Sequence, residues 1–197
     1  MEPRGLMVIK DPEVAKLFSD KIRREILHLL THKEMSIADL VREMEKNFSS
    51  VAYHLRLLEK AGLVQKVREE IVQNKIQPYF RATAWSFHVS YSLDEAMTGD
   101  EEYRAWQEDL VNRLIKGLEA YGLMVPSNKL ERVKELIKIL YIQQKKEFEE
   151  RREMRKPEIQ LEPHIGKSIA HILSSTRLVV DLKHQDAAEE LAAILDL

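Results

Sequence analysis

The chain has 197 residues and carries 31 lysines and arginines against 33 aspartates and glutamates, which gives a formal net charge of −2. Apolar residues make up 44% of the sequence, which is enough to build a core and excludes global disorder. The absence of cysteine excludes a disulfide scaffold, a thiolate metal site and a cysteine nucleophile.

No run approaches the roughly 18 apolar residues of a membrane span, and the first ten residues lack the apolar core of a signal peptide. We therefore expect a soluble, cytoplasmic protein without membrane contact. Few glycines and prolines predict a mainly helical chain, and the high charge content indicates a thermophile. Residues 1–85 hold 15 basic and 12 acidic residues, whereas residues 86–197 hold 16 and 21, so the two halves are expected to have different partners.

Helix signals follow one another through the first 62 residues. Asp11 before Pro12 predicts a first short helix, because aspartate caps a helix and proline fits its first turn. Asp20 is expected to cap a second helix. Ser36 and Asp39 have the spacing of a capping box that opens a third helix.

A fourth helix is predicted over residues 48–60, with Asn47 as its cap and Gly62 beyond its end. Two alternating segments then follow, 63–68 and 76–83, and they predict a β-hairpin joined by the polar loop 69–75. Pro78 lacks the N–H group that a ladder needs, which favours an edge position for its strand.

The order of these elements is that of a winged helix-turn-helix, and three segments resemble the ArsR family of bacterial and archaeal regulators. Residues 19–27 (SDKIRREIL) resemble the family's opening, residues 49–64 (SSVAYHLRLLEKAGLV) its recognition helix, and residues 79–83 (YFRAT) the second wing strand of archaeal members. The resemblance covers about residues 11–85. It implies a homodimeric transcription factor that reads double-stranded DNA.

The residues of the fourth helix agree independently with DNA contact. At about 100° per residue, Val51, Leu55 and Leu58 share one face. The opposite face is polar and basic, which suits base edges and phosphates in the major groove. Together with basic wing residues, the predicted DNA-binding set is Ser49, Ser50, Tyr53, His54, Arg56, Lys60, Arg68, Lys75 and Arg81.

Alternatives remain for parts of this set. The outward face of the helix can instead be a solvated amphipathic face, and His54 is as consistent with packing beside the core as with a phosphate contact. Phe48 and Ala52 depart from the family's usual residues, so no base preference carries over. The wing lacks the family's usual glycine turn and is longer, and Glu69 and Glu70 oppose its basic residues.

No metal site or cofactor is predicted. The segment that carries the thiolate site in relatives reads Met35 to Leu40 here, without cysteine. His28 and His32 stand four residues apart, which permits chelation, but surface histidines are the simpler interpretation. The histidines at 164, 171 and 184, with Asp181, form no recognised ligand spacing.

The second half carries three long amphipathic stripes, in helices predicted at about 100–121, from 127 towards Pro157, and over 165–179, before a short terminal helix. The third stripe keeps the 4-3-4-3 spacing of a helix pair. These stripes either pack within the chain or form a dimer interface, and we favour the interface because a small domain cannot cover them all. The predicted dimerisation residues are Trp106, Leu110, Leu114, Leu118, Val133, Ile137, Leu140, Ile165, Ile169, Ile172 and Val179.

The predicted architecture is therefore mainly α with a small β-hairpin wing. It comprises a winged helix-turn-helix DNA-binding domain (1–92) and an all-α dimerisation or regulatory domain (93–197). The aromatic residues in 85–91 have two interpretations: they line a ligand cavity, or they pack in the core. The sequence names no small-molecule effector.

No enzyme is expected, because Gly166-Lys167-Ser168 lacks the earlier glycine of a phosphate-binding loop, with Leu161 in its place. The leading hypothesis is a dimeric transcriptional regulator, a repressor rather than an activator, that reads a palindromic operator. The rival hypothesis is a winged helix used only as a protein–protein module, without specific DNA binding.

Overall fold

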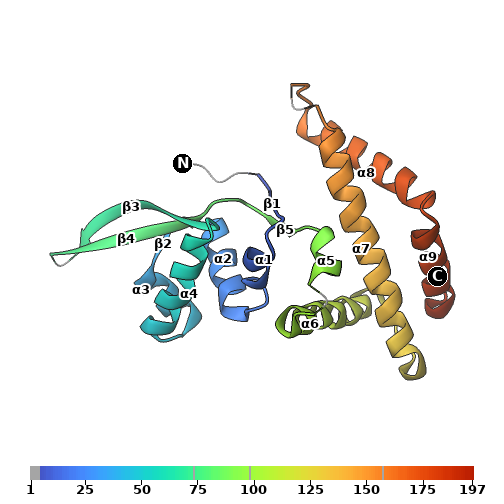
Figure 1. Ribbon diagram of the computed structural model, residues 1–197, viewed down its shortest axis with the longest axis horizontal. Coiled ribbons are helices and arrows are strands. Elements are labelled where there is room, and N and C mark those ends of the chain that lie inside the picture. The colour runs from blue at the N-terminus through green and yellow to red at the C-terminus, as the bar shows by residue number, and fades with distance from the viewer. Residues whose placement is uncertain (1–4, 73, 98, 157) are drawn as a thin grey trace. The chain divides into compact units, whose positions relative to one another are not determined.

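The computed structural model describes residues 5–72, 74–97, 99–156 and 158–197. The chain divides into two compact units (Figure 1). One holds the residues up to Val89 together with Asp100–Tyr103, and the other holds Ser90–Gly99 together with Arg104–Leu197.

The helices of the first unit begin at the predicted caps. They are α1 (Pro12–Lys16), α2 (Lys21–His32), α3 (Ile37–Met44) and α4 (Phe48–Lys60). The Asp11, Asp20 and Asn47 side chains each accept a hydrogen bond from a backbone N–H two or three residues on, at 2.8 to 2.9 Å. Ser36 and Asp39 form both bonds of the capping box. The predicted starts of these four helices are confirmed.

The wing is an antiparallel hairpin of β3 (Val64–Val72) and β4 (Lys75–Ala82), with β2 (Met35–Ser36) on the other side of β4. The predicted loop 69–75 is wrong, because cross-strand pairs continue to Val72 opposite Lys75. β4 is the central strand of this sheet, but at Pro78 it is an edge, as predicted. Proline is tolerated there because β2 pairs only with Tyr79 and Phe80, so no third strand lies beside Pro78.

A second, smaller sheet was not predicted. β1 (Met7–Ile9) runs parallel to β5 (Phe87–Val89), with Val8 opposite His88. Each strand is only three residues long, so neither has enough alternation to stand out in the sequence.

The core of the first unit lies between its helices and the base of the wing. Large buried side chains come from α2, α3, α4, the start of β3 and the residue before it, and they include Ile26, Leu30, Leu40, Val51, Leu55, Leu58, Leu63 and Val64. Gly62 has φ of +71°, the left-handed conformation that ends α4 and turns the chain into β3. The packing therefore fixes one face of α4 inward and leaves the other outward.

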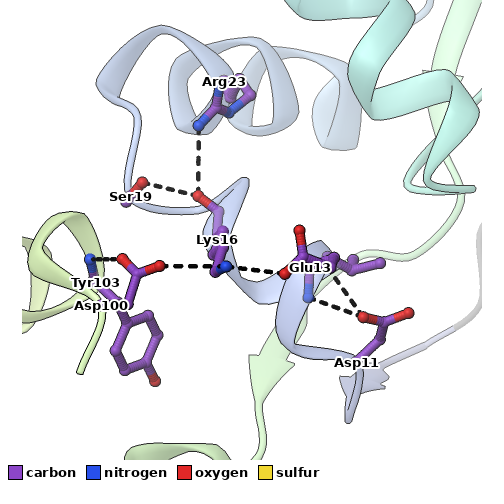
Figure 2. A network of polar contacts seen from close by, with 8 residues as sticks. Asp11, Glu13, Lys16, Ser19, Arg23, Asp100 and Tyr103 are labelled. Atoms are coloured by element: carbon purple, nitrogen blue, oxygen red, sulfur yellow. Dashed lines mark hydrogen bonds and ion pairs between the residues drawn. The ribbon is translucent and has the colours of Figure 1, made fainter. Parts of the chain in front are cut away.

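A polar network connects α1 with residues 100–103 inside this unit (Figure 2). The ammonium group of Lys16 lies 2.8 Å from a Glu13 carboxylate oxygen and 3.3 Å from one of Asp100. The other oxygen of Asp100 accepts a hydrogen bond from the backbone N–H of Tyr103 at 2.9 Å, and this bond holds the pKa of Asp100 below its ordinary value. The side chain of Tyr103 is buried.

The second unit is helical. It contains α5 (Ser92–Ala96), most of α6 (Glu101–Leu118), α7 (Leu130–Met154), α8 (Pro163–Val179) and α9 (Leu182–Leu195). The short 3-10 turns Glu119–Tyr121 and Ser127–Lys129 follow α6 and precede α7. The three predicted long helices are confirmed, and the terminal helix is longer than expected, whereas α5 was not predicted. Pro157, the expected end of α7, lies outside the described residues.

Within the second unit, α7 packs against α8 and α9. Its first half enters an apolar cluster with Val111, Val133 and Ile137 at the centre. In its second half the buried carboxylate of Glu149 accepts hydrogen bonds from the hydroxyl of Ser90 at 2.7 Å and from the backbone N–H of Tyr91 at 2.8 Å. No described helix is both long and apolar enough to cross a membrane.

Candidate nucleic-acid interface

The outward face of α4 carries the polar residues that the sequence predicted. Ser49, Tyr53, Arg56 and Lys60 are exposed, whereas Val51, Leu55 and Leu58 on the other face are buried. The Asn47 cap sets the start of the helix through its bond to the backbone N–H of Ser50. The helix therefore presents hydroxyl, phenol, guanidinium and ammonium groups on one continuous surface.

His54 lies beside this face rather than on it. Its side chain is only 12% exposed, and its Nδ1 lies 3.8 Å from Oδ1 of Asp20, the residue that caps α2. Its ring meets that of Tyr53 edge-on at 5.3 Å between centroids. Of the two alternatives left open by the sequence, this position favours packing. Ser50 is half-buried, at the first turn of the helix.

The five predicted cations fall into two groups. Arg56, Lys60 and Lys75 are exposed, and none of them has an ion-pair partner within the part of the chain that the structure describes. Arg68 and Arg81 are both drawn towards Glu34, which the sequence did not single out. Lys66, which the sequence also did not single out, pairs with Glu69 at 2.7 Å.

The Glu34 carboxylate accepts a hydrogen bond from Nε of Arg68 at 2.8 Å and lies 3.9 Å from Nη1 of Arg81. Arg68 also pairs with Glu70, and its guanidinium stacks 3.7 Å from the centroid of the Tyr79 ring. The hydrogen bond to Glu34, and to a smaller extent the one to Glu70, raises the pKa of Arg68. Arg68 is therefore held in ion pairs with two carboxylates, and Arg81 faces one of them at a longer distance.

The predicted dimerisation residues separate into three groups by exposure. Val133 and Ile137 are buried in the core of the second unit, with Leu118 packed against them. Trp106, Leu110 and Leu140 are half-buried, and Leu114 is at the edge of exposure. In contrast, Ile165, Ile169, Ile172 and Val179 of α8 are all exposed.

The structure also bears on the possible metal site and the possible ligand cavity. Among the described residues, no group of three or more histidines, aspartates or glutamates is arranged to hold a metal ion. The rings of His28 and His32 stand edge to face, 4.8 Å apart, on the exposed side of α2. A cavity of about 280 Å³ lies between α6 and α7, with charged residues such as Arg104, Glu108 and Lys134 around Val111. No aromatic residue of 85–91 lines it.

Sequence reasoning missed several residues of this surface. Glu34 is 34 positions from Arg68, so no local spacing announces their contact. Phe48 at the start of α4 and Ile71 and Ile76 near the tip of the wing are exposed apolar side chains. The symmetric positions of the two isoleucines about the turn could have indicated, from the sequence, that they lie opposite each other.

A model of the arsR family of bacterial regulatory proteins matches residues 20–66. An uncharacterized HTH-type transcriptional regulator of Methanocaldococcus jannaschii is 37% identical over 62 residues, which are 31% of this chain and 68% of that protein.

Two solved structures are also similar. The homodimeric winged helix-turn-helix DNA-binding domain of a possible ArsR-family transcriptional regulator from Mycobacterium bovis is 25% identical, with 36% of this chain and 61% of that chain covered and a TM-score of 0.32. Reduced HlyU from Vibrio cholerae is 22% identical, with 52% and 87% covered and a TM-score of 0.32. The chain thus spans about three fifths of the M. bovis domain.

Proposed function

The chain belongs to the ArsR family of helix-turn-helix transcriptional regulators, and we propose that it is a sequence-specific DNA-binding repressor that acts as a homodimer. The observation that carries this proposal is the outward face of α4. There Arg56 and Lys60 are exposed beside Ser49 and Tyr53 and have no acidic partner among the described residues. A winged helix that serves only protein contacts has no need of such a free basic face.

In the proposed complex α4 enters the major groove. Ser49, Tyr53 and Arg56 reach base edges, where an arginine contacts guanine by two hydrogen bonds. The ammonium group of Lys60 faces a phosphate. The first turn of α4, at Ser50, faces another phosphate, because a helix N-terminus attracts anions. Lys75, exposed near the tip of the wing, follows the backbone on the flank.

Dimerisation is proposed through the second unit, and α8 supports it. The residues of α8 that are half-buried include Gly166, Ala170 and Ser174, spaced four apart. The Ser174 hydroxyl donates to the buried carboxylate of Glu147 at 2.8 Å, and Arg177 on the same side pairs with Glu150 of α7. This helix therefore packs on α7 with its small and polar side.

The large apolar residues of α8 lie on the opposite side. This side exposes four apolar residues at 4-3-7 spacing, namely Ile165, Ile169, Ile172 and Val179. Thr176 lies between the last two, and its hydroxyl donates a hydrogen bond to the carbonyl of Ile172 at 2.8 Å. We call these five residues the α8 seam. An apolar seam of this spacing is typical of a helix pair. Val133 and Ile137 instead serve the core of their own unit.

A second copy of the chain is the partner that best fits this seam. Residues 168–176 (SIAHILSST) contain no lysine, arginine, aspartate or glutamate in a chain of which 32% is charged. Two identical helices can therefore meet here without like-charge repulsion. A symmetric dimer carries two α4 helices, which read half-sites about 34 Å apart, one turn of B-DNA. The proposed operator is accordingly palindromic.

The proposed mechanism is steric occupation of a promoter by this dimer. A signal that acts on the second unit would release it. Activation of transcription from the same site is the alternative outcome, and a reporter fused to the selected operator distinguishes the two.

The experiment that tests DNA binding uses a duplex selected by the full-length protein from a random pool. Fluorescence anisotropy compares this duplex with a scrambled one at two salt concentrations. We expect tighter binding to the selected duplex and a steep loss of affinity with salt. The Arg56→Ala/Lys60→Ala variant should lose at least about tenfold in affinity.

The matched control is Lys116→Ala/Lys183→Ala, which removes two exposed cations from the second unit. It should bind within about twofold of the unmodified protein. Equal and weak binding to both duplexes, unchanged by the α4 substitutions, would support the protein–protein module instead.

A further inference from the structure

The tip of the wing carries an apolar pair that the proposed contacts do not use. Ile71 of β3 stands directly opposite Ile76 of β4, so both side chains leave the same face of the hairpin. Ile71 is 79% exposed and Ile76 is 68% exposed. Val72, opposite Lys75, points to the other face and is less exposed, at 41%.

No other element in the described part of the first unit covers this pair. β2 reaches only to Tyr79 of β4, so the hairpin beyond that residue has two strands. Figure 1 shows it projecting away from α3 and α4. The two isoleucines therefore form an exposed apolar surface at the end of a two-stranded ribbon.

The distribution of exposed apolar side chains points to the nature of that partner. In the described part of the first unit the large exposed apolar residues are Phe48, Tyr53, Ile71, Val72, Ile76 and Trp85. Two lie on α4 and three at the tip of the wing, the two elements that contact DNA in the proposed complex. Apolar residues that served the folding of this unit would instead lie over its core.

The charges of the tip also suit DNA. Residues 71–76 (IVQNKI) contain one lysine and no acidic residue. The acidic residues further down β3 are matched within the wing, Glu69 by Lys66 and Glu70 by Arg68. The surface that leads to the isoleucines therefore does not repel phosphates.

We propose that Ile71 and Ile76 form an apolar wedge that enters the minor groove next to the major groove occupied by α4. This inference rests on the proposed function. Aliphatic side chains in that groove pack against sugars and base edges and open a base step, which bends the duplex. The wedge adds affinity that does not depend on counterion release, and it favours sequences that bend easily.

The test compares two wing variants on the duplex selected by the unmodified protein. Ile71→Ser/Ile76→Ser should lower affinity about tenfold, the equivalent of one apolar side chain left in water. The slope of log affinity against log salt should stay the same. Lys75→Gln should instead reduce that slope by about one, because it removes a phosphate contact.

DNA bending is the second readout. Energy transfer between dyes at the two ends of the duplex should show a smaller bend with Ile71→Ser/Ile76→Ser than with the unmodified protein. The matched control is Val72→Ser, which makes the same kind of change on the other face of the hairpin and should keep both affinity and bend. Circular dichroism verifies that the variants remain folded.

Two results would overturn the wedge. One is an unchanged affinity and bend in the isoleucine variant while Arg56→Ala/Lys60→Ala still loses binding, which would leave the proposed function intact. The other is a change of oligomeric state in light scattering with DNA affinity retained, which would assign the pair to a protein contact. Failure of the unmodified protein to select any duplex would remove the wedge together with the proposed function.

Discussion

Glu34 accepts a hydrogen bond from Nε of Arg68 at 2.8 Å, although the two residues are 34 positions apart in the chain. The same carboxylate lies 3.9 Å from Arg81, so one acidic residue faces both arginines that the sequence predicted as wing contacts to DNA. In this state neither arginine is available to a phosphate without competing with Glu34.

Replacing this carboxylate is expected to strengthen DNA binding. Glu34→Gln removes one negative charge and frees a guanidinium, so affinity should rise several-fold at low salt, and the slope of log affinity against log salt should steepen by about one. Fluorescence anisotropy across a salt series measures both. Glu69→Gln, which frees Lys66 at the exposed edge of β3, serves as the comparison and should have the smaller effect. A flatter slope in Glu34→Gln would show that Glu34 positions Arg68 for contact.

Charges in the seam of α8 should separate the proposed dimer. Ile169→Lys/Ile172→Lys places like charges opposite each other in a symmetric helix pair, and light scattering at micromolar concentration should then report a monomer. Affinity for a palindromic duplex should fall by about 100-fold, because each half-site is bound alone. Met124→Lys changes an exposed apolar residue elsewhere in the same unit and should remain dimeric. If the seam variant also stays dimeric, another surface joins the copies.

The capping box of α3 should make part of the stability sensitive to acid. Hydrogen bonds from Ser36 lower the pKa of Asp39 below its ordinary value of 3.8. The carboxylate therefore stabilises the folded state above that value, and this stability is lost as the pH falls through the lower pKa of the folded protein. Ser36→Ala should cost about 1 kcal/mol near neutral pH and less near pH 3.

Urea unfolding at the two pH values measures this difference. Asn47→Ala removes the cap of α4, which has no titratable group. It should cost a similar amount at both pH values. A loss in Ser36→Ala that does not change with pH would contradict the role assigned to Asp39.

The buried carboxylate in α7 should be important for the stability of the second unit. Glu149→Ala leaves the buried hydroxyl of Ser90 and the N–H of Tyr91 without the bonds that they now donate. We expect a loss of roughly 2–4 kcal/mol in the free energy of unfolding. Glu149→Gln keeps one carbonyl acceptor and should lose less. Equal losses in the two variants, measured by thermal unfolding, would show that the charge matters rather than the hydrogen bonds.

The sequence by itself determined the local elements of this protein. The caps at Asp11, Asp20, Ser36 and Asn47 act within two or three residues, so their spacing was enough to predict where the first helices begin. The same holds for the two faces of α4, because helical periodicity alone places Val51, Leu55 and Leu58 together.

Only the tertiary structure decided the relations between elements. It paired Glu34 with Arg68, joined β1 to β5, and continued the wing through residues that read as a loop. It also gave similar apolar stripes different surroundings: Val133 of α7 lies in a core, whereas Ile172 of α8 is exposed, although both belong to stripes with helical spacing. The physical reason is that a stripe specifies only that a face is apolar, whereas the partner that covers it depends on contacts between distant parts of the chain.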